Sequence, residues 1–567
     1  MILTTTTFLN NCCCCFLYKI LLYKKIISLL LLLLIQTVFG QSKFSETEKL
    51  AATCKVWGFL KYYHPKVANG EKNWDKQLFE ILPKIEQSKS KEEFSLILEG
   101  WIDSLGEVQK IEPITQPKEI EYFDENFDLS WINNNSLYSK KLSAKLIFIE
   151  KNRYQGDQHY IGLLRAENVF VKNENYLDYK FTDRNSRILG LFMYWNLIEY
   201  FFPYKYVMDK KWDITLKEML PVFINAQNED DFYIAMQKLT VRLNDSHAIF
   251  YKYAKKRYFL PIVCKIIDEK MIVTEILNDN LVKTDDIKVG NIITKVNDKA
   301  IKEIILENRD LIKASNEVSY LYNLVEPTLS GYEENIKLEF LINGEIIVKT
   351  INWVNYNSNR YELKKEIKNE KFKILENNIG YVNMAALSVK DVPEMIQKLK
   401  LNKAIVFDMR NYPNGTFEEI SKFLNNKEKK FAIYTKPDLK YPGRFKWTEG
   451  TMCGSENSNN YRGKVIVLLN EESVSQSEWT AMCFQTAGNT TIIGSQTGGA
   501  DGNVSNFDLI KAFFTRFSGV GVYYPDKRQT QRIGIIPDIE VKPTIKGIQD
   551  GKDEILDRAI KFIETGK

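Results

Sequence analysis

The chain has 567 residues, of which 44% are hydrophobic and 27% charged, a balance that suits a globular protein and argues against a disordered one. At roughly 100–200 residues per domain, this length predicts three or four domains. The net charge of +5 comes from 78 basic and 73 acidic residues spread without a basic stripe. The charge pattern therefore gives no sign of nucleic-acid binding.

The N-terminus has the pattern of an export signal. Two lysines precede an apolar run over 26–35, and Gly40 supplies a small residue at which cleavage is expected. The run is shorter than the roughly 20 residues that a membrane-spanning helix needs. We therefore expect residues 1–40 to be a signal peptide and the mature protein to be exported to the periplasm or cell envelope. Two alternatives stay open: an uncleaved leader that anchors the chain in the membrane, and a translation start near Leu22.

The cysteines predict neither disulfides nor a metal site. Four of the eight lie in the leader, and the others are widely separated, without metal-ligand spacing: Cys54, Cys264, Cys453 and Cys483. We expect buried free thiols and no cofactor.

The first half of the chain contains a duplication. Residues 57–65 match residues 195–203, and the match continues without a gap at an offset of 138. Apolar residues fall at helical spacing in both copies. We therefore expect helical repeats over 41–114 and 181–256, with a β-containing connecting region over 115–180. Within that region, the run 145–149 is expected to be a strand.

Residues 257–355 change to alternating, strand-like patterns. Apolar runs at 260–267 and 271–276 precede a turn and strand over 290–297, and Asn343-Gly344 is a strong signal for a hairpin. This order is similar to a PDZ domain, and the resemblance implies binding of extended peptide termini at a sheet edge. The alternative is a plain small β-domain.

From residue 370 to 567 short apolar strands alternate with helices, which predicts an α/β layered domain. The expected strands are 378–382, 404–407, 464–469 and 491–494, and the expected helices are 391–400, 417–424 and 477–486.

A candidate nucleophile lies where one of these strands meets a helix. The strand ends at Asn470, and a polar turn with three serines, among them Ser475, leads into a helix from Glu478. A serine at such a junction stands clear of the sheet, and the helix N-terminus offers unpaired N–H groups to a developing oxyanion. The alternative is that one of these serines only caps the helix.

Four motifs, in order and behind the PDZ-like region, together resemble the tail-specific (C-terminal-processing) serine proteases. They are 406–415 for "D-L-R-x-N-P-G-G", 473–478 for "S-A-S-A-S-E", 492–498 for "iiG-x-x-T-x-G" and 534–539 for "G-I-x-P-D". The resemblance implies a ClpP/crotonase-like layered core, acyl-enzyme hydrolysis of polypeptides and Ser475 as the nucleophile.

The general base departs from one branch of that family. Its bacterial members carry a lysine 25 residues after the nucleophile, where this chain has Ala500. The tricorn-like branch uses a histidine in an "L-x-D-x-H" motif, which is similar to residues 243–247, so the resemblance implies His247 as the base. Imidazole titrates in the range that activates a serine. The other two histidines are weaker candidates, because His64 corresponds to a phenylalanine in the second repeat and His159 has no chemical neighbours. The alternative for His247 is a structural histidine at a helix end.

The resemblance also implies the remaining site residues. Gln531 stands where tricorn-like proteases place the glutamate that orients the imidazole, with Glu540 or Asp538 as substitutes. The backbone amides of Gln476 and Gly415 are the expected oxyanion donors.

The sequence thus predicts a multidomain α+β protein: an exported serine endopeptidase that acts on an extended segment or C-terminus of a polypeptide recruited by a PDZ-like domain. Two other functions stay open: a catalytically degenerate peptide-binding protein, and an esterase or amidase that uses the same residues.

Overall fold

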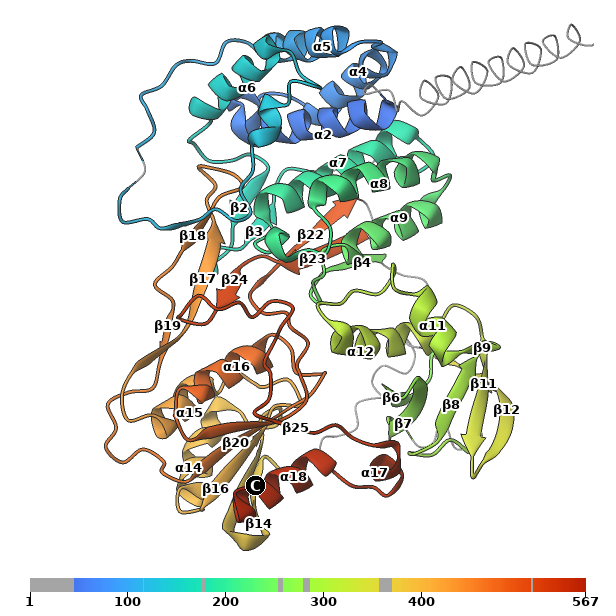
Figure 1. Ribbon diagram of the computed structural model, residues 1–567, viewed down its shortest axis with the longest axis vertical. Helices are drawn as coiled ribbons and strands as arrows, with labels where there is room; N and C mark the ends of the chain where they lie inside the picture. The colour runs from blue at the N-terminus through green and yellow to red at the C-terminus, as the bar shows by residue number, and fades with distance from the viewer. Residues whose placement is uncertain are drawn as a thin grey trace, which may run out of the picture.

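The computed structural model describes residues 45–115, 117–174, 179–252, 258–278, 286–355, 370–510 and 513–567. The expected signal peptide over 1–40 lies outside the described residues. Within them, no helix is both long and apolar enough to cross a membrane. The protein is a mixed α/β molecule of several lobes, with the N-terminal helices stacked at one end and two sheet-containing lobes at the other (Figure 1).

The N-terminal helices follow the sequence duplication closely. In each copy a long helix is followed by a short helical turn and two further helices; the long helices and the two further helices begin 138 residues apart, and the short turns 140. The first copy contains α2 (Glu46–Tyr63), α3 (Pro65–Ala68), α4 (Trp74–Gln87) and α5 (Lys91–Ser104); the second contains α7 (Arg184–Phe201), η2 (Lys205–Val207), α8 (Trp212–Asn225) and α9 (Glu229–Val241).

Paired tryptophans explain why both copies fold alike. The indole N–H of Trp57 donates to the carbonyl of Trp74 at 3.4 Å, and the indole of Trp74 donates back at 3.0 Å. Trp195 and Trp212 repeat this exchange at 3.0 and 2.9 Å. All four are buried, so each pair fills the core between its two helices while satisfying both indole donors.

The two copies contact each other at equivalent positions. Gly58 of α2 lies against the side chain of Asn196 of α7, which occupies the matching place in the second copy. The amide of Asn196 donates to the carbonyls of Cys54 and Phe192, another equivalent pair, at 3.1 and 2.9 Å. A glycine on one helix thus makes room for a polar residue that ties both helices together.

The connecting region differs from the prediction in one element. The run 145–149, expected to be a strand, lies inside helix α6 (Lys140–Lys151). Its buried residues Leu142, Leu146 and Ile149 recur at a spacing of four and three, which is the period of a helix. The other elements of this region are short: β1 (Tyr122–Phe123), η1 (Ser130–Asn133), β2 (Ile161–Leu163) and β3 (Val169–Val171).

The second lobe is a small sheet in the order β12-β11-β8-β7-β6, with two helices. The expected hairpin is present, and Asn343 and Gly344 both have positive φ (53° and 87°), as a two-residue hairpin turn requires. Its elements are β6 (Ile262–Ile267), β7 (Lys270–Ile276), β8 (Ile292–Val296), β9 (Lys299–Ala300), α11 (Ile301–Glu307), α12 (Glu317–Thr328), β11 (Asn335–Ile342) and β12 (Glu345–Asn352). The short strands β5 (Tyr258–Phe259), β10 (Ser330–Gly331) and β13 (Val354–Asn355) pair beside it.

The third lobe is the α/β layered domain. Its sheet has the order β14-β15-β16-β20-β21-β25, with parallel pairing from β15 onward. The elements are β14 (Phe372–Leu375), β15 (Ile379–Asn383), α14 (Val392–Leu399), β16 (Ala404–Asp408), α15 (Phe417–Leu424), β20 (Lys464–Leu469), α16 (Gln476–Gln485), β21 (Thr490–Gly494), β25 (Ile539–Glu540) and α18 (Glu554–Thr565). Every expected strand and helix of this lobe is confirmed to within a few residues.

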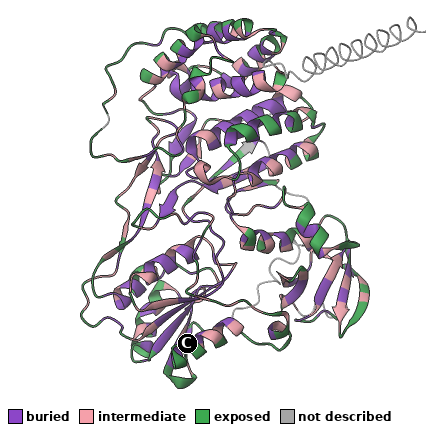
Figure 2. Ribbon diagram, viewed as in Figure 1, coloured by how far each residue is buried: buried purple, intermediate pink, exposed green. Residues whose placement is uncertain are grey.

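Alternate residues of the central strands face opposite layers. Phe407 and Val467 pack with the helices α14, α15 and α16, whereas Val406 and Ile466 pack with α18. This is the period of two that a sheet buried on both faces requires. Figure 2 shows the resulting buried strands between their two helical layers.

A further sheet joins this lobe to the N-terminal helices. Strand β4 (Ile249–Lys252), which follows the second helical repeat, pairs antiparallel with β23 (Phe513–Ser518), which in turn pairs with β22 (Val504–Ile510). Phe513 stacks on Phe250 of β4 and belongs to the hydrophobic core of the helices. Residues 245–252 are therefore fixed against the C-terminal part of the chain. The remaining strands, β17 (Lys429–Pro437), β18 (Phe445–Trp447), β19 (Thr451–Cys453) and β24 (Gly521–Tyr523), pair in another sheet together with β1.

Candidate active site

Ser475 occupies a strained turn between β20 and α16. Its backbone has φ 57° and ψ −114°, a conformation that costs a non-glycine residue about 1–3 kcal/mol. The Ser475 N–H is held by the carbonyl of Ala500 at 2.9 Å and by Oε2 of Glu478 at 3.0 Å. A sharp strand-to-helix turn of this kind exposes the hydroxyl of a nucleophilic serine above its sheet.

Glu478 ties a second loop to this turn. Its side chain is buried and accepts hydrogen bonds from the amides of Gly499 and Ala500 at 2.8 and 3.2 Å, from the hydroxyl of Thr497, and from Ser475. Burial raises the pKa of Glu478 to about 7, although these donors oppose the rise. The carboxyl group therefore positions the turn and does not reach the cavity in front of Ser475.

His247 is held by a hydroxyl and a carboxylate in series. Its Nδ1 lies 2.9 Å from Oγ of Ser518, and that hydroxyl donates to Oδ1 of Asp245 at 3.0 Å. Because the Ser518 proton points to Asp245, Nδ1 must carry the hydrogen of the ring. Nε2 is then left with a free lone pair, which is the tautomer that a general base needs.

Asp245 is the centre of this arrangement. It is buried and accepts hydrogen bonds from the backbone amides of His247 and Ser518 at 3.0 and 2.8 Å, and from Nε2 of Gln531 at 3.2 Å. The expectation that Gln531 orients the imidazole is therefore wrong in detail: Gln531 contacts Asp245, and Ser518 contacts the ring.

The two substitutes for Gln531 lie elsewhere. Asp538 accepts the backbone N–H of Ile492 at 2.8 Å, and Glu540 of β25 forms an ion pair with Lys542 at 2.8 Å. Both belong to the edge of the core sheet, so neither contacts His247.

Burial dominates the proton affinity of the imidazole. It lowers the pKa of His247 to about 4; Asp245 raises the pKa, while Arg516 and Lys313 lower it further. The ring is accordingly neutral at physiological pH and ready to accept a proton.

Ser475 and His247 line the same cavity, although more than two hundred residues separate them in the chain. Its volume is about 590 Å³. Arg516 and Tyr412 line it, as does buried Asp501, whose pKa is raised well above its usual range by burial, with a contribution from Glu478. The remaining lining residues are Tyr434, Val474, Gln476, Trp479, Gly502, Asn503, Val504, Val520 and Val522.

Only one of the two expected oxyanion donors lines the cavity. Gln476 lines the cavity as the first residue of α16, and its backbone N–H has no acceptor within the described part of the chain. Gly415, which has φ 67°, is not among the lining residues, although Tyr412 of the same loop is. A donor role for Gly415 stays a prediction.

The other two histidines lie outside the cavity. His64 is buried, and its Nδ1 accepts the N–H of Lys66 at 3.3 Å, so it caps helix α3 as a structural residue. His159 packs edge-on against Tyr160 and contacts Asn173.

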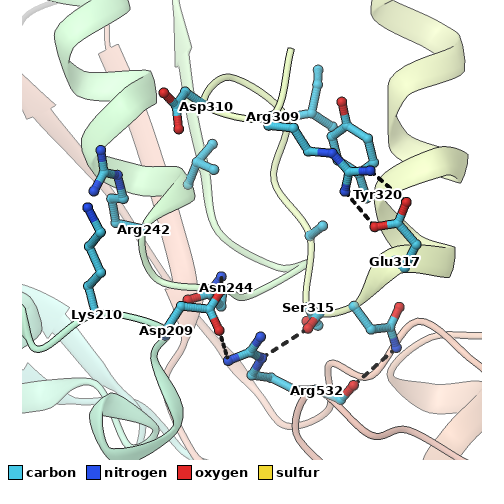
Figure 3. Close-up of a pocket in the computed structure, with 14 residues that line it drawn as sticks. Asp209, Lys210, Arg242, Asn244, Arg309, Asp310, Ser315, Glu317, Tyr320 and Arg532 are labelled. Atoms are coloured by element: carbon cyan, nitrogen blue, oxygen red, sulfur yellow. Dashed lines mark hydrogen bonds and ion pairs between the residues drawn. The ribbon is translucent and has the colours of Figure 1, made fainter. Parts of the chain in front are cut away.

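The second lobe supports the segment that carries His247. Ser246 and Ser315 exchange backbone-to-hydroxyl hydrogen bonds of 2.8 and 2.9 Å. Arg532 donates to the carbonyl of Ser315 at 3.2 Å and pairs with Asp209 at 2.7 Å, as Figure 3 shows at the floor of a separate cavity of about 520 Å³. In that second cavity Arg309 and Glu317 also pair with each other, at 2.5 Å.

The sequence offered different signals for the residues that complete the site. Glu478 closes the serine-rich box, and Asp245 belongs to the histidine motif, so both were visible as parts of patterns. Ser518 had no signal, because a serine in an alternating strand looks like any other polar residue.

Comparisons with known proteins find one matching family model and several similar folds. Residues 378–541 match the model of peptidase family S41. The structure of mature CPAF complexed with lactacystin is similar, with a TM-score of 0.54 at 12% identity over 67% of this chain and 99% of that one, which indicates a shared fold. The photosystem II D1 C-terminal processing protease gives a TM-score of 0.39 at 14% identity, over 65% of this chain and 98% of that one. No curated protein sequence matches the chain.

The matched segment contains the strained Ser475, and the cavity in front of it contains an imidazole whose tautomer is that of a base. Residues 378–541 are therefore similar to peptidase family S41, and the chain shares its fold with mature CPAF.

Proposed function

We propose that this protein is an exported serine endopeptidase that cleaves polypeptides through an acyl-enzyme, with Ser475 as the nucleophile and His247 as the base. One observation carries the proposal: a serine held in a strained turn at a helix N-terminus shares a cavity with an imidazole whose Nδ1 proton is held by Ser518 and Asp245.

Each residue of the site has a role in the proposed hydrolysis. His247 Nε2 takes the hydroxyl proton as Oγ of Ser475 attacks the peptide carbonyl carbon, and the N–H of Gln476 stabilises the oxyanion. The imidazolium, stabilised by Asp245 through Ser518, returns its proton to the leaving amine as the C–N bond breaks. A water molecule, activated by the same imidazole, then hydrolyses the ester and restores Ser475.

The second lobe is proposed to recruit substrate as a PDZ-like domain does. A groove of about 250 Å³ runs between β6 and α12, and β6 is the last strand in its sheet. Such an edge supports addition of an extended peptide as a further strand, with apolar side chains of α12 as its specificity pockets. Its lining residues are Cys264, Lys265, Ile266, Ile267, Asp268, Val318, Leu321, Tyr322, Val325, Glu471, Ser495, Lys542 and Pro543.

This groove is joined to the catalytic loop. Lys265 of β6 pairs with Glu471 at 2.6 Å, and Glu471 lies in the loop that leads to Ser475. A peptide bound along β6 would therefore end near the turn that holds the nucleophile.

Labelling with a fluorophosphonate tests the chemistry. We expect the native protein to be labelled, Ser475→Ala to lose all labelling, and His247→Ala to be labelled far more slowly. An unlabelled native protein, or equal labelling of Ser475→Ala, would favour a peptide-binding protein without catalytic activity. Comparing the hydrolysis of a peptide and of a short ester by unlabelled native enzyme then separates a peptidase from an esterase.

Export rests on the leader over 1–40 and has its own test. The N-terminus of the protein recovered from the cell envelope should begin at Gln41, and a retained leader would indicate a membrane anchor instead.

A further inference from the structure

Two cations lie beside the catalytic histidine without an acidic partner. Within the described part of the chain, neither Arg516 nor Lys313 forms an ion pair, whereas Arg242, Arg309 and Arg532 each do. Both are half-buried, and both affect the proton affinity of His247. Partly buried charges without a counter-charge cost stability, so their presence in a catalytic cavity needs an explanation.

Arg516 is directed into the cavity by its strand. It lies two residues before Ser518 on β23, so both side chains point to the same face, the one that carries His247. Its Nε donates to the backbone carbonyl of His247 at 3.1 Å, which fixes the stem of the side chain. The terminal N–H groups of the guanidinium have no acceptor among the described residues, and the residue lines the cavity together with Ser475.

Lys313 approaches from the second lobe. It lies in the segment between α11 and α12, next to residues that support Ser246. Burial lowers the pKa of Lys313 to about 8, Arg516 lowers it further, and Asp245 and Glu326 raise it. The charge of Arg516 therefore disfavours the charged form of Lys313.

The nearby acid does not neutralise them. Asp245 provides one negative charge, but its oxygens already accept hydrogen bonds from His247, Ser518 and Gln531. With the imidazole neutral, the cluster keeps a net positive charge. The other buried acid of the cavity, Asp501, forms no ion pair with Arg516 within the described residues, and burial raises its pKa well above its usual range, which favours its neutral form.

The position of the cluster indicates which part of a substrate it meets. His247 must return its proton to the leaving amine, so groups beside the imidazole border the segment that follows the scissile bond. A guanidinium fork binds a carboxylate through two parallel hydrogen bonds, and an ammonium adds a point charge.

We propose that Arg516 and Lys313 form a carboxylate-binding subsite that selects peptides with a negative charge just beyond the scissile bond. The carboxylate is either the free C-terminus of the substrate, one or two residues past the cleaved bond, or the side chain of an aspartate or glutamate there. This inference rests on the proposed function of Ser475 and His247.

Three peptides of one sequence test the subsite: one that ends as a free acid two residues after the scissile bond, its C-terminal amide, and an amide with aspartate directly after the scissile bond. We expect kcat/KM of at least one anionic peptide to exceed that of the neutral amide by about 10–100-fold. The anionic peptide whose kcat/KM exceeds that of the neutral amide identifies the source of the carboxylate. Raising the ionic strength should narrow the ratio.

Substitutions show which residues cause the preference for anionic peptides. Arg516→Met and Lys313→Met should each reduce the ratio of anionic to neutral peptide, whereas Arg516→Lys should keep part of it. Lys302→Met, which alters an exposed lysine paired with Glu269 on the same lobe, should leave the ratio unchanged. The ratio is the readout because Arg516 also contacts His247, and a general loss of activity cancels between substrates.

Two results would contradict the proposed subsite. One is equal cleavage of the anionic and neutral peptides by the native enzyme. The other is a ratio of anionic to neutral kcat/KM in the Arg516→Met/Lys313→Met double variant that equals the ratio of the native enzyme. Fluorophosphonate labelling of Ser475 in the same preparations shows whether the peptidase chemistry is intact. Failure of the subsite is thereby distinguished from failure of the proposed function.

Discussion

At the residue scale, the site depends on how His247 is buried. Burial lowers its pKa to about 4, so the ring is neutral and able to act as a base at any pH well above that value. We expect the acid limb of the kcat/KM profile to fall near pH 4 to 5, below the range of an ordinary histidine near 6.5. A profile measured with a neutral peptide checks this, and a limb between pH 6 and 7 would contradict it.

The same shift affects stability. The unfolded chain binds a proton to this histidine at a higher pH than the folded chain does, so stability decreases as the pH falls from about 6.5 toward 4. His64, whose pKa is also lowered to about 4 by burial, adds to this loss.

Ser518 is the positioning residue of the site. Ser518→Ala should remove the link between Nδ1 of His247 and Asp245, so that the imidazolium loses its stabilisation and the ring its fixed tautomer. We expect kcat to fall by about 10–100-fold with little change in KM.

Ser518→Thr keeps the hydroxyl and should retain most of this activity, which separates the hydroxyl from mere packing. An equal loss in both variants, or a change confined to KM, would show that Ser518 only fills space.

At the residue scale, the sequence located the reactive pair but not its support. Ser475 and His247 belong to motifs, and the structure places both at one cavity. Gln531 was expected to contact the ring because a glutamate occupies the matching position in tricorn-like proteases. Here Asp245 already supplies the negative charge, and an amide donor can lie 3.2 Å from it where a second carboxylate would be repelled.

At the element scale, the packing of α2 on α7 depends on the absence of one side chain. A Cβ at Gly58 would overlap the side chain of Asn196, whereas one at Gly100, on the exposed face of α5, would meet nothing within 4 Å. Gly58→Ala should therefore lower the free energy of unfolding by about 1–3 kcal/mol. Gly100→Ala should raise it by up to about 1 kcal/mol, because alanine favours the helix.

Thermal or denaturant unfolding of the two variants measures whether each substitution lowers or raises the free energy of unfolding. Equal effects at the two positions would mean that the contact between the helices does not limit the choice of residue at Gly58.

The elements themselves followed from periodicity where one face is buried. Helix α15 was predicted to its exact residues, because its apolar positions face a sheet and its other face is solvated. The run 145–149 was mistaken for a strand because four apolar residues in succession fit both structures, and only the flanking buried positions in α6 reveal a helical period.

At the scale of the whole molecule, the active site belongs to no single lobe. The proposed nucleophile comes from the α/β domain and the proposed base from the end of the second helical repeat, and β23 joins these parts by pairing with β4. The sequence could not predict this pairing, since long-range strand partners leave no local pattern.

Because the site is shared between lobes, we can predict the behaviour of a truncated protein. The isolated segment 370–567 retains Ser475 but lacks β4 and His247. We expect fluorophosphonate to label it far more slowly than it labels the chain from residue 45 under the same conditions, and circular dichroism should establish whether the segment folds. A folded segment that is labelled at the native rate would contradict the role of His247.

The pairing of β23 with β4 also sets the moment at which hydrolysis becomes available. A ribosome adds roughly 5–20 residues per second and releases N-terminal regions to fold first. The helical repeats and β4 emerge long before their partner strand, which lies within the last sixty residues of the chain. We therefore expect that a nascent chain cannot bring Ser475 and His247 into one site before β23 has been synthesised.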